Sequence, residues 1–143
     1  MTFRDILRFR LPKSWVAEYH QDGALFREPQ DMGVLMLNVV DFECPEPATT
    51  ERAVDLLATY GDHEGREVLH LTNGSAFVAF VETSEPVTSF VWEVVHPLCP
   101  ATLRMAAFSF IVKSEIEGNR EVVDTVSMLT KEIAGTKFLN TPS

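Results

Sequence analysis

The four histidines are the first side chains to consider for chemistry, because imidazole binds metals and transfers protons near neutral pH. One of them lies in a compact polar triplet, Asp62-His63-Glu64, and His70 follows His63 by seven residues. A metal site could use both histidines and one carboxylate of the triplet. However, the chain has no HExxH motif and no facial-triad spacing, and the two histidines are separated by an expected helix-to-strand turn. We therefore expect surface loop residues here and predict no metal site.

Ser75 and Cys99 are the candidate nucleophiles. Ser75 lies in an Asn-Gly-Ser turn sequence without the GxSxG elbow, where these residue types are favoured for backbone reasons. Cys99 follows His96 by three residues, but a base must come within about 2.6–3.2 Å of its nucleophile, and the intervening Pro97 makes that contact hard to form. A triad of Ser75 with a histidine and an aspartate stays an open alternative. We predict no catalytic residue, and an enzyme is the less favoured interpretation.

The glycines and cysteines do not predict a cofactor. Gly61, Gly65 and Gly74 form neither GxGxxG nor a P-loop, so neither nucleotide nor dinucleotide binding is expected. Each of the two cysteines, Cys44 and Cys99, precedes a proline, and no CxxC pair offers zinc ligands. A disulfide or a reactive thiol is one interpretation. We favour two reduced cysteines at strand ends, since cytosolic thiols normally stay reduced.

The distribution of charge is more informative than these motifs. The 143 residues contain 12 Lys and Arg against 21 Asp and Glu, a net charge of −9, and this excludes a nucleic-acid binder, which needs a basic surface. Residues 1–13 carry four cations against one acid, whereas residues 41–67 carry two against eight. We expect these two regions to lie side by side and to steer a basic protein partner or a second copy of the chain. A solvated surface that only confers solubility is the alternative. The predicted protein-binding residues are Glu51, Asp55, Asp62 and Glu64.

Alternating apolar residues, separated by turn residues, predict a series of strands. In residues 6–11 the alternation places Leu7, Phe9 and Leu11 on the core side. Asp22-Gly23 and Asn73-Gly74 are hairpin turn signals, and we expect Trp15 and Trp92 to be core residues rather than parts of a ligand pocket. The expected strands cover residues 6–11, 15–19, 24–27, 34–41, 67–71, 76–82, 88–95 and 103–113.

Two amphipathic helices complete the predicted pattern. The first follows Thr49 or Thr50 as the N-cap and ends at Gly61. The second spans residues 120–134, with Asn119 as its cap and Gly135 as its end, and its apolar stripe consists of Val122, Val126, Leu129 and Ile133. The pattern predicts one α+β domain, residues 1–143, with an antiparallel sheet of six to seven strands flanked by helices.

The segment Phe9-Arg10-Leu11-Pro12-Lys13-Ser14-Trp15 resembles the opening of the PsbP/Mog1-like superfamily, in which a strand, a proline and a tryptophan lead into a hairpin. The order of elements and the last helix with its tail at Phe138 are also similar to that superfamily. The resemblance implies a layered αβα sandwich used mainly for docking to proteins, such as a nuclear-transport GTPase or photosystem subunits. No functional residue is carried over, because no functional motif matches. It thus favours a non-enzymatic protein-binding or adaptor domain.

Two alternatives follow from the same pattern. A small-ligand-binding or enzymatic domain would place a pocket between the sheet and the C-terminal helix, as in the helix-grip fold. That fold has its helix pair directly after the first strand, whereas three strands precede the first helix here. Obligate self-association would use the basic first strand as a sheet edge. Because the sequence shows neither an export signal nor an apolar stretch that spans a bilayer, we expect a cytoplasmic protein without membrane insertion.

Overall fold

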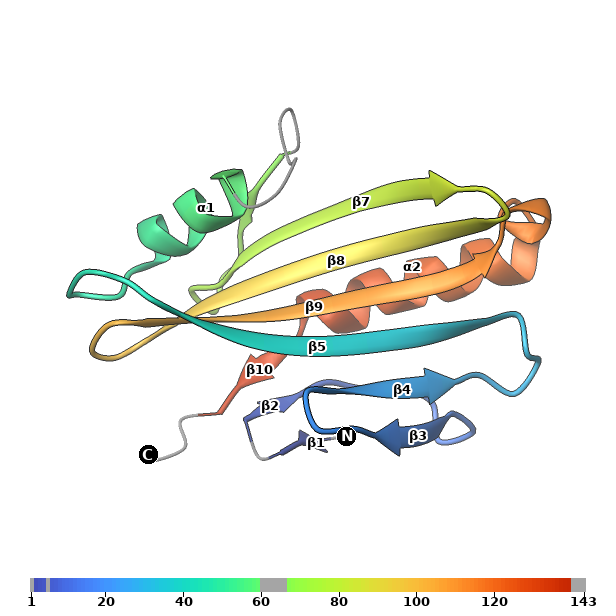
Figure 1. Ribbon diagram of the computed structural model, residues 1–143, viewed down its shortest axis with the longest axis horizontal. Helices are drawn as coiled ribbons and strands as arrows, with labels where there is room; N and C mark the ends of the chain where they lie inside the picture. The colour runs from blue at the N-terminus through green and yellow to red at the C-terminus, as the bar shows by residue number, and fades with distance from the viewer. Residues whose placement is uncertain (1, 5, 60–66, 140–143) are drawn as a thin grey trace.

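The computed structural model describes residues 2–4, 6–59 and 67–139 (Figure 1). Its helices are α1 (Thr50–Thr59), α2 (Arg120–Ala134) and a short 3-10 turn, η1 (Ser114–Ile116). Its strands are β1 (Thr2–Phe3), β2 (Leu7–Arg8), β3 (Val16–Tyr19), β4 (Gly23–Arg27), β5 (Gly33–Glu43), β6 (Leu69–His70), β7 (Ala76–Ser84), β8 (Val87–Leu98), β9 (Thr102–Lys113) and β10 (Lys137–Phe138).

Seven of the strands form one antiparallel sheet in the order β3-β4-β5-β9-β8-β7-β6. β5, β9 and β8 pair along almost their whole length and form the centre of this sheet (Figure 1). A separate sheet in the order β1-β2-β10 joins the two ends of the chain. The predicted fold class, an α+β domain with an antiparallel sheet of six to seven strands flanked by helices, is confirmed.

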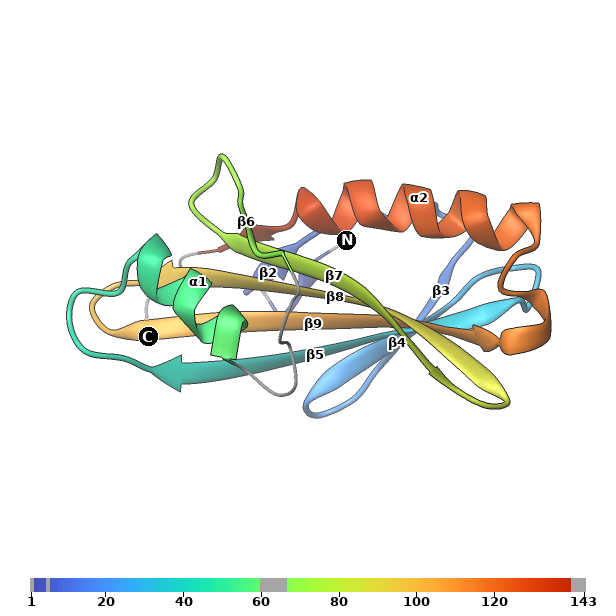
Figure 2. The same ribbon diagram turned by 90° about the horizontal axis from the view of Figure 1, so that it is seen from above.

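The two helices lie on opposite faces of the large sheet (Figure 2). Alternation along each strand sends Trp92, Phe108 and Phe110 to the face covered by α2 and the small sheet, where they form the larger core. The opposite face is covered at one end by α1, which buries Ala53 and Leu57 in a second, smaller core. The tryptophans Trp15 and Trp92 are both buried, as the sequence predicted.

Both predicted helices are present, and α2 has the predicted bounds. Its residues Val122, Leu129 and Ile133 are fully buried, which confirms most of the predicted stripe. Asn119 stands at the cap position, although its side chain makes no capping hydrogen bond. In α1 the cap is Thr49, whose Oγ1 accepts a hydrogen bond from the Arg52 amide at 3.2 Å. The predicted end of α1, Gly61, lies outside the described residues.

Both predicted hairpins are present, but the first predicted strand and the details of the two hairpin loops differ from expectation. Only Leu7 and Arg8 of residues 6–11 form a strand, and it is not an edge, because β2 pairs with β1 on one side and β10 on the other. Tyr19 pairs with Ala24, and the His20 amide donates a hydrogen bond to the Gly23 carbonyl oxygen. The loop of the first hairpin is therefore residues 21–22, and Gly23 begins β4. Gly23 is needed there for close approach: a Cβ would lie 2.0 Å from a β5 carbonyl oxygen. The second loop has three residues, 72–74.

Two further expectations concern the thiols and the bilayer. Cys44 directly follows β5 and Cys99 directly follows β8, and both are free thiols, as predicted. Among the described residues, neither helix combines the length and apolarity needed to cross a membrane.

Candidate functional site

The structure describes half of the predicted acidic docking surface. Glu51 and Asp55 lie one turn apart on the exposed side of α1, while Asp62 and Glu64 lie outside the described residues. The expectation that the acidic helix lies beside the basic first strand is wrong. α1 covers one face of the large sheet, whereas β2 belongs to the small sheet on the other face. The separation arises because β2 pairs with β10, which directly follows α2.

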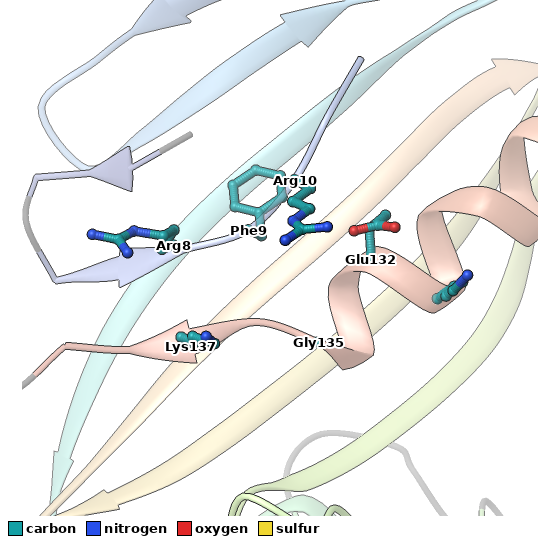
Figure 3. Close-up of a pocket in the computed structure, with 7 residues that line it drawn as sticks. Arg8, Phe9, Arg10, Glu132, Gly135 and Lys137 are labelled. Carbon is teal, nitrogen blue, oxygen red and sulfur yellow. The ribbon is translucent and has the colours of Figure 1, made fainter. Parts of the chain in front are cut away.

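A basic pocket lies where β2, β10 and the end of α2 meet (Figure 3). Its volume is about 410 Å³. Four of the lining side chains are cationic and only one is anionic. Arg8 and Lys137 stand directly opposite each other in the β2–β10 pair, although 129 positions separate them in the sequence. The lining residues are Arg8, Phe9, Arg10, Lys131, Glu132, Gly135 and Lys137.

Phe9 positions the two arginines of this pocket. Its side chain is only 2% exposed, and its ring meets those of Phe26 and Phe108 edge-on at centroid distances of 5.5 and 5.1 Å. Because neighbouring residues of an extended chain point to opposite sides, burial of Phe9 turns Arg8 and Arg10 outward. Figure 3 shows Arg10 directed towards Glu132 on α2.

The cations of the pocket lack neutralising partners within the described part of the chain. None of the four makes an ion pair within 4 Å or a side-chain hydrogen bond there. Arg104 offers a contrast, since its Nε and Nη2 donate to the two Asp41 oxygens at 2.8 and 2.9 Å. The pocket therefore gathers a third of the chain's 12 Lys and Arg residues around a single lining carboxylate, on a protein that is acidic as a whole.

A row of four polar side chains crosses the sheet on the face that α2 covers. Asp41 on β5 pairs with Arg104 on β9, which pairs with His96 on β8, and Ser75 stands just before β7. The Ser75 hydroxyl and His96 Nδ1 are 2.8 Å apart. The sequence did not predict the contact between Ser75 and His96. The signal that could have paired them is the hairpin turn at residues 85–86 between β7 and β8. A turn at that position sets the register of the two strands so that Ser75 lies opposite His96.

This row has a structural role. Ser75 has 0% exposure, so its hydroxyl is closed to a substrate. The His96 ring stacks on Phe138 at 5.2 Å and so ties β10 to the large sheet. Burial lowers the pKa of His96, whereas the hydrogen bond from Arg104 to Asp41 raises the pKa of Arg104. Neutral histidine is therefore the form that the fold favours.

The remaining candidates from the sequence are not brought together. His70 is exposed on β6, and its proposed metal partners, residues 62–64, lie outside the described residues. Within the described ranges, no cluster of three or more His, Cys, Asp or Glu could hold a metal ion. Cys99 is exposed just beyond β8, whereas His96 Nδ1 is already engaged by Ser75.

A groove of about 430 Å³ lies between β8 and α2, where the ligand-binding alternative placed its pocket. Phe90, Val123 and Thr130 are among the residues that line it. Val123 is 52% exposed, and the space beneath the groove is filled by Trp92 and Leu129, which are almost completely buried. The groove is thus a shallow surface feature above a filled core.

No protein-family model and no curated protein sequence matches the chain. A solved structure from Bacteroides thetaiotaomicron is similar, with a TM-score of 0.54 and 13% identity over 94% of this chain and 45% of that one. The human StarD13 (DLC2) lipid transfer and protein localization domain has a TM-score of 0.47 and 9% identity, over 85% and 89% of the two chains. The chain thus spans less than half of the Bacteroides protein, and that similarity concerns the fold alone.

Proposed function

We propose that this protein is a non-enzymatic binding domain that docks a basic protein partner through the acidic surface of α1. The observation that carries the proposal is that acidic and basic side chains lie on opposite faces of the sheet, while the space between the sheet and α2 is filled. Acidic side chains are exposed on α1, and the cations of the first segment are gathered on the opposite face of the sheet. Large aromatic side chains fill the space between the sheet and α2.

The way in which α1 packs leaves its acidic side available. Only Ala53 and Leu57 of this helix are buried, and they contact the end of the sheet. Glu51 and Asp55 consequently point into solvent, and Asp62 and Glu64 extend the same acidic stretch of sequence. Clustered charges of one sign accelerate encounter with a partner of opposite sign and select against wrong partners.

The layered arrangement supports the same proposal. α2 covers one face of the sheet (Figure 2), and α1 packs on one end of the opposite face, as in the αβα sandwich that the PsbP/Mog1-like resemblance implies. Members of that superfamily act mainly by docking to proteins. We include in the proposal membership of that superfamily and a cytoplasmic adaptor role.

The experiment that tests docking is a pull-down from native lysate with a charge-reversed variant. Glu51→Lys, Asp55→Lys and Glu64→Lys together should markedly reduce recovery of the partner. The matched control reverses three acids near the start of α2, Glu115, Glu121 and Asp124, which gives the same change in net charge. Circular dichroism verifies that both variants fold. If the partner is recovered equally with wild type and the α1 variant, the docking surface is not on α1.

A further inference from the structure

We propose that the basic pocket binds a small oxyanion that carries two or more negative charges, such as a phosphate ester or a polycarboxylate. This inference goes beyond the docking function, because it concerns another face of the molecule and another class of ligand. It rests on the four cationic residues Arg8, Arg10, Lys131 and Lys137, which all line one pocket.

The cations of the pocket repel one another. Like charges in directly opposite positions destabilise a strand pair, and Arg8 and Lys137 occupy such positions. In the described residues these cations have no neutralising partner within ion-pair distance, and Glu132 is the one carboxylate that lines the pocket. An anion in the pocket would be attracted by the cations that line it, and it would screen their mutual repulsion.

The side chains that line the pocket are of the types that bind oxyanions. An arginine guanidinium presents paired N–H donors that match a carboxylate or a phosphate, and a lysine adds a compact charge. Two arginines and two lysines therefore suit an oxyanion with several oxygens. The opposing charge at the end of α2 is reduced, because the carbonyl groups of Lys131, Glu132 and Ile133 accept bonds from the Gly135 and Thr136 amides and the Thr136 hydroxyl.

The size of the pocket suits a small ligand. A pocket of about 410 Å³ falls in the range that holds a small organic ligand. A long polyanion would extend beyond the pocket, where a chain of net charge −9 repels it. Gly135, which also lines the pocket, adds no side chain to the space. These features favour a small ligand over a nucleic acid.

Isothermal titration calorimetry of the full chain tests the proposal with pyrophosphate and citrate as probes, at constant ionic strength. The pocket variant combines Arg8→Gln, Arg10→Gln and Lys137→Gln. The control variant combines Lys13→Gln, Arg27→Gln and Lys113→Gln, three exposed cations outside the pocket. The affinity of wild type should fall at least about tenfold in the pocket variant, since charge-assisted hydrogen bonds are lost. It should change less than about twofold in the control variant.

The two probes distinguish the sources of the oxyanion. Tighter binding of pyrophosphate identifies a phosphate ligand, and tighter binding of citrate identifies a polycarboxylate. Equal losses of affinity in the pocket and control variants would overturn the proposal, because the attraction would then be non-specific. Absence of binding by the wild-type protein would also overturn it. If the pocket variant does not fold, the single variant Lys131→Gln, at an exposed position of α2, is measured in its place. It should still weaken binding severalfold. The partner pull-down reports separately on α1, so each proposal can fail alone.

Discussion

Replacement of Phe9 tests whether the small sheet is anchored to the main core by burial. The Phe9→Ala variant removes a ring that is 2% exposed and contacts Phe26 and Phe108 edge-on. Removal of such a buried phenylalanine costs about 3–5 kcal/mol of unfolding free energy. Because a domain of this size has a total stability of about 5–15 kcal/mol, the change should be large in a urea titration.

Tyr19→Ala is the matched control for Phe9→Ala. Tyr19 also contacts two rings, those of Phe3 at 6.3 Å and Phe26 at 6.5 Å, but it is 56% exposed. Its removal should cost about 1 kcal/mol, near the value of an aromatic pair with little burial. Urea denaturation followed by circular dichroism measures both variants. A loss from Tyr19→Ala as large as that from Phe9→Ala would refute the reasoning that burial dominates over ring contacts.

Four further predictions concern single positions. Burial lowers the pKa of His96, so the unfolded chain takes up a proton at a higher pH than the folded chain does. The free energy of unfolding should therefore decrease as the pH falls below about 6.5, the ordinary pKa of histidine. The decrease should level off once the pH is below the pKa of His96 in the folded protein. Denaturation at several pH values should therefore show a smaller loss in His96→Asn than in wild type. Gly135→Ala should be neutral or stabilising by up to about 1 kcal/mol, since Gly135 has a φ of −88°. Gly33→Ala should instead destabilise the protein, because its Cβ would lie 2.7 Å from a β9 carbonyl oxygen; urea titration measures both. Thr130→Val leaves the indole N–H of Trp92 without its 3.0 Å acceptor and should cost about 1–3 kcal/mol, which thermal denaturation can detect.

The sequence was sufficient for features that depend on neighbouring residues. The bounds of α2, its buried stripe and the core sides of residues 6–11 and 103–113 follow from periodicity and from capping residue types. The short length of β2 was not predictable in this way, because its partners come from opposite ends of the chain. Nor was the loop of the first hairpin, whose position depends on how closely Gly23 approaches β5.

The candidate sites show the same division. The sequence alone determined that cations are concentrated in residues 1–13 and acids in residues 41–67. Only the tertiary structure decided that Arg8 meets Lys137 and that Ser75 meets His96. The physical reason is that helix and strand preferences arise from interactions over a few residues. The pairing of distant strands is instead selected by burial of whole faces in a shared core. That selection separated the acidic helix from the basic segment and assembled the basic pocket from both ends of the chain.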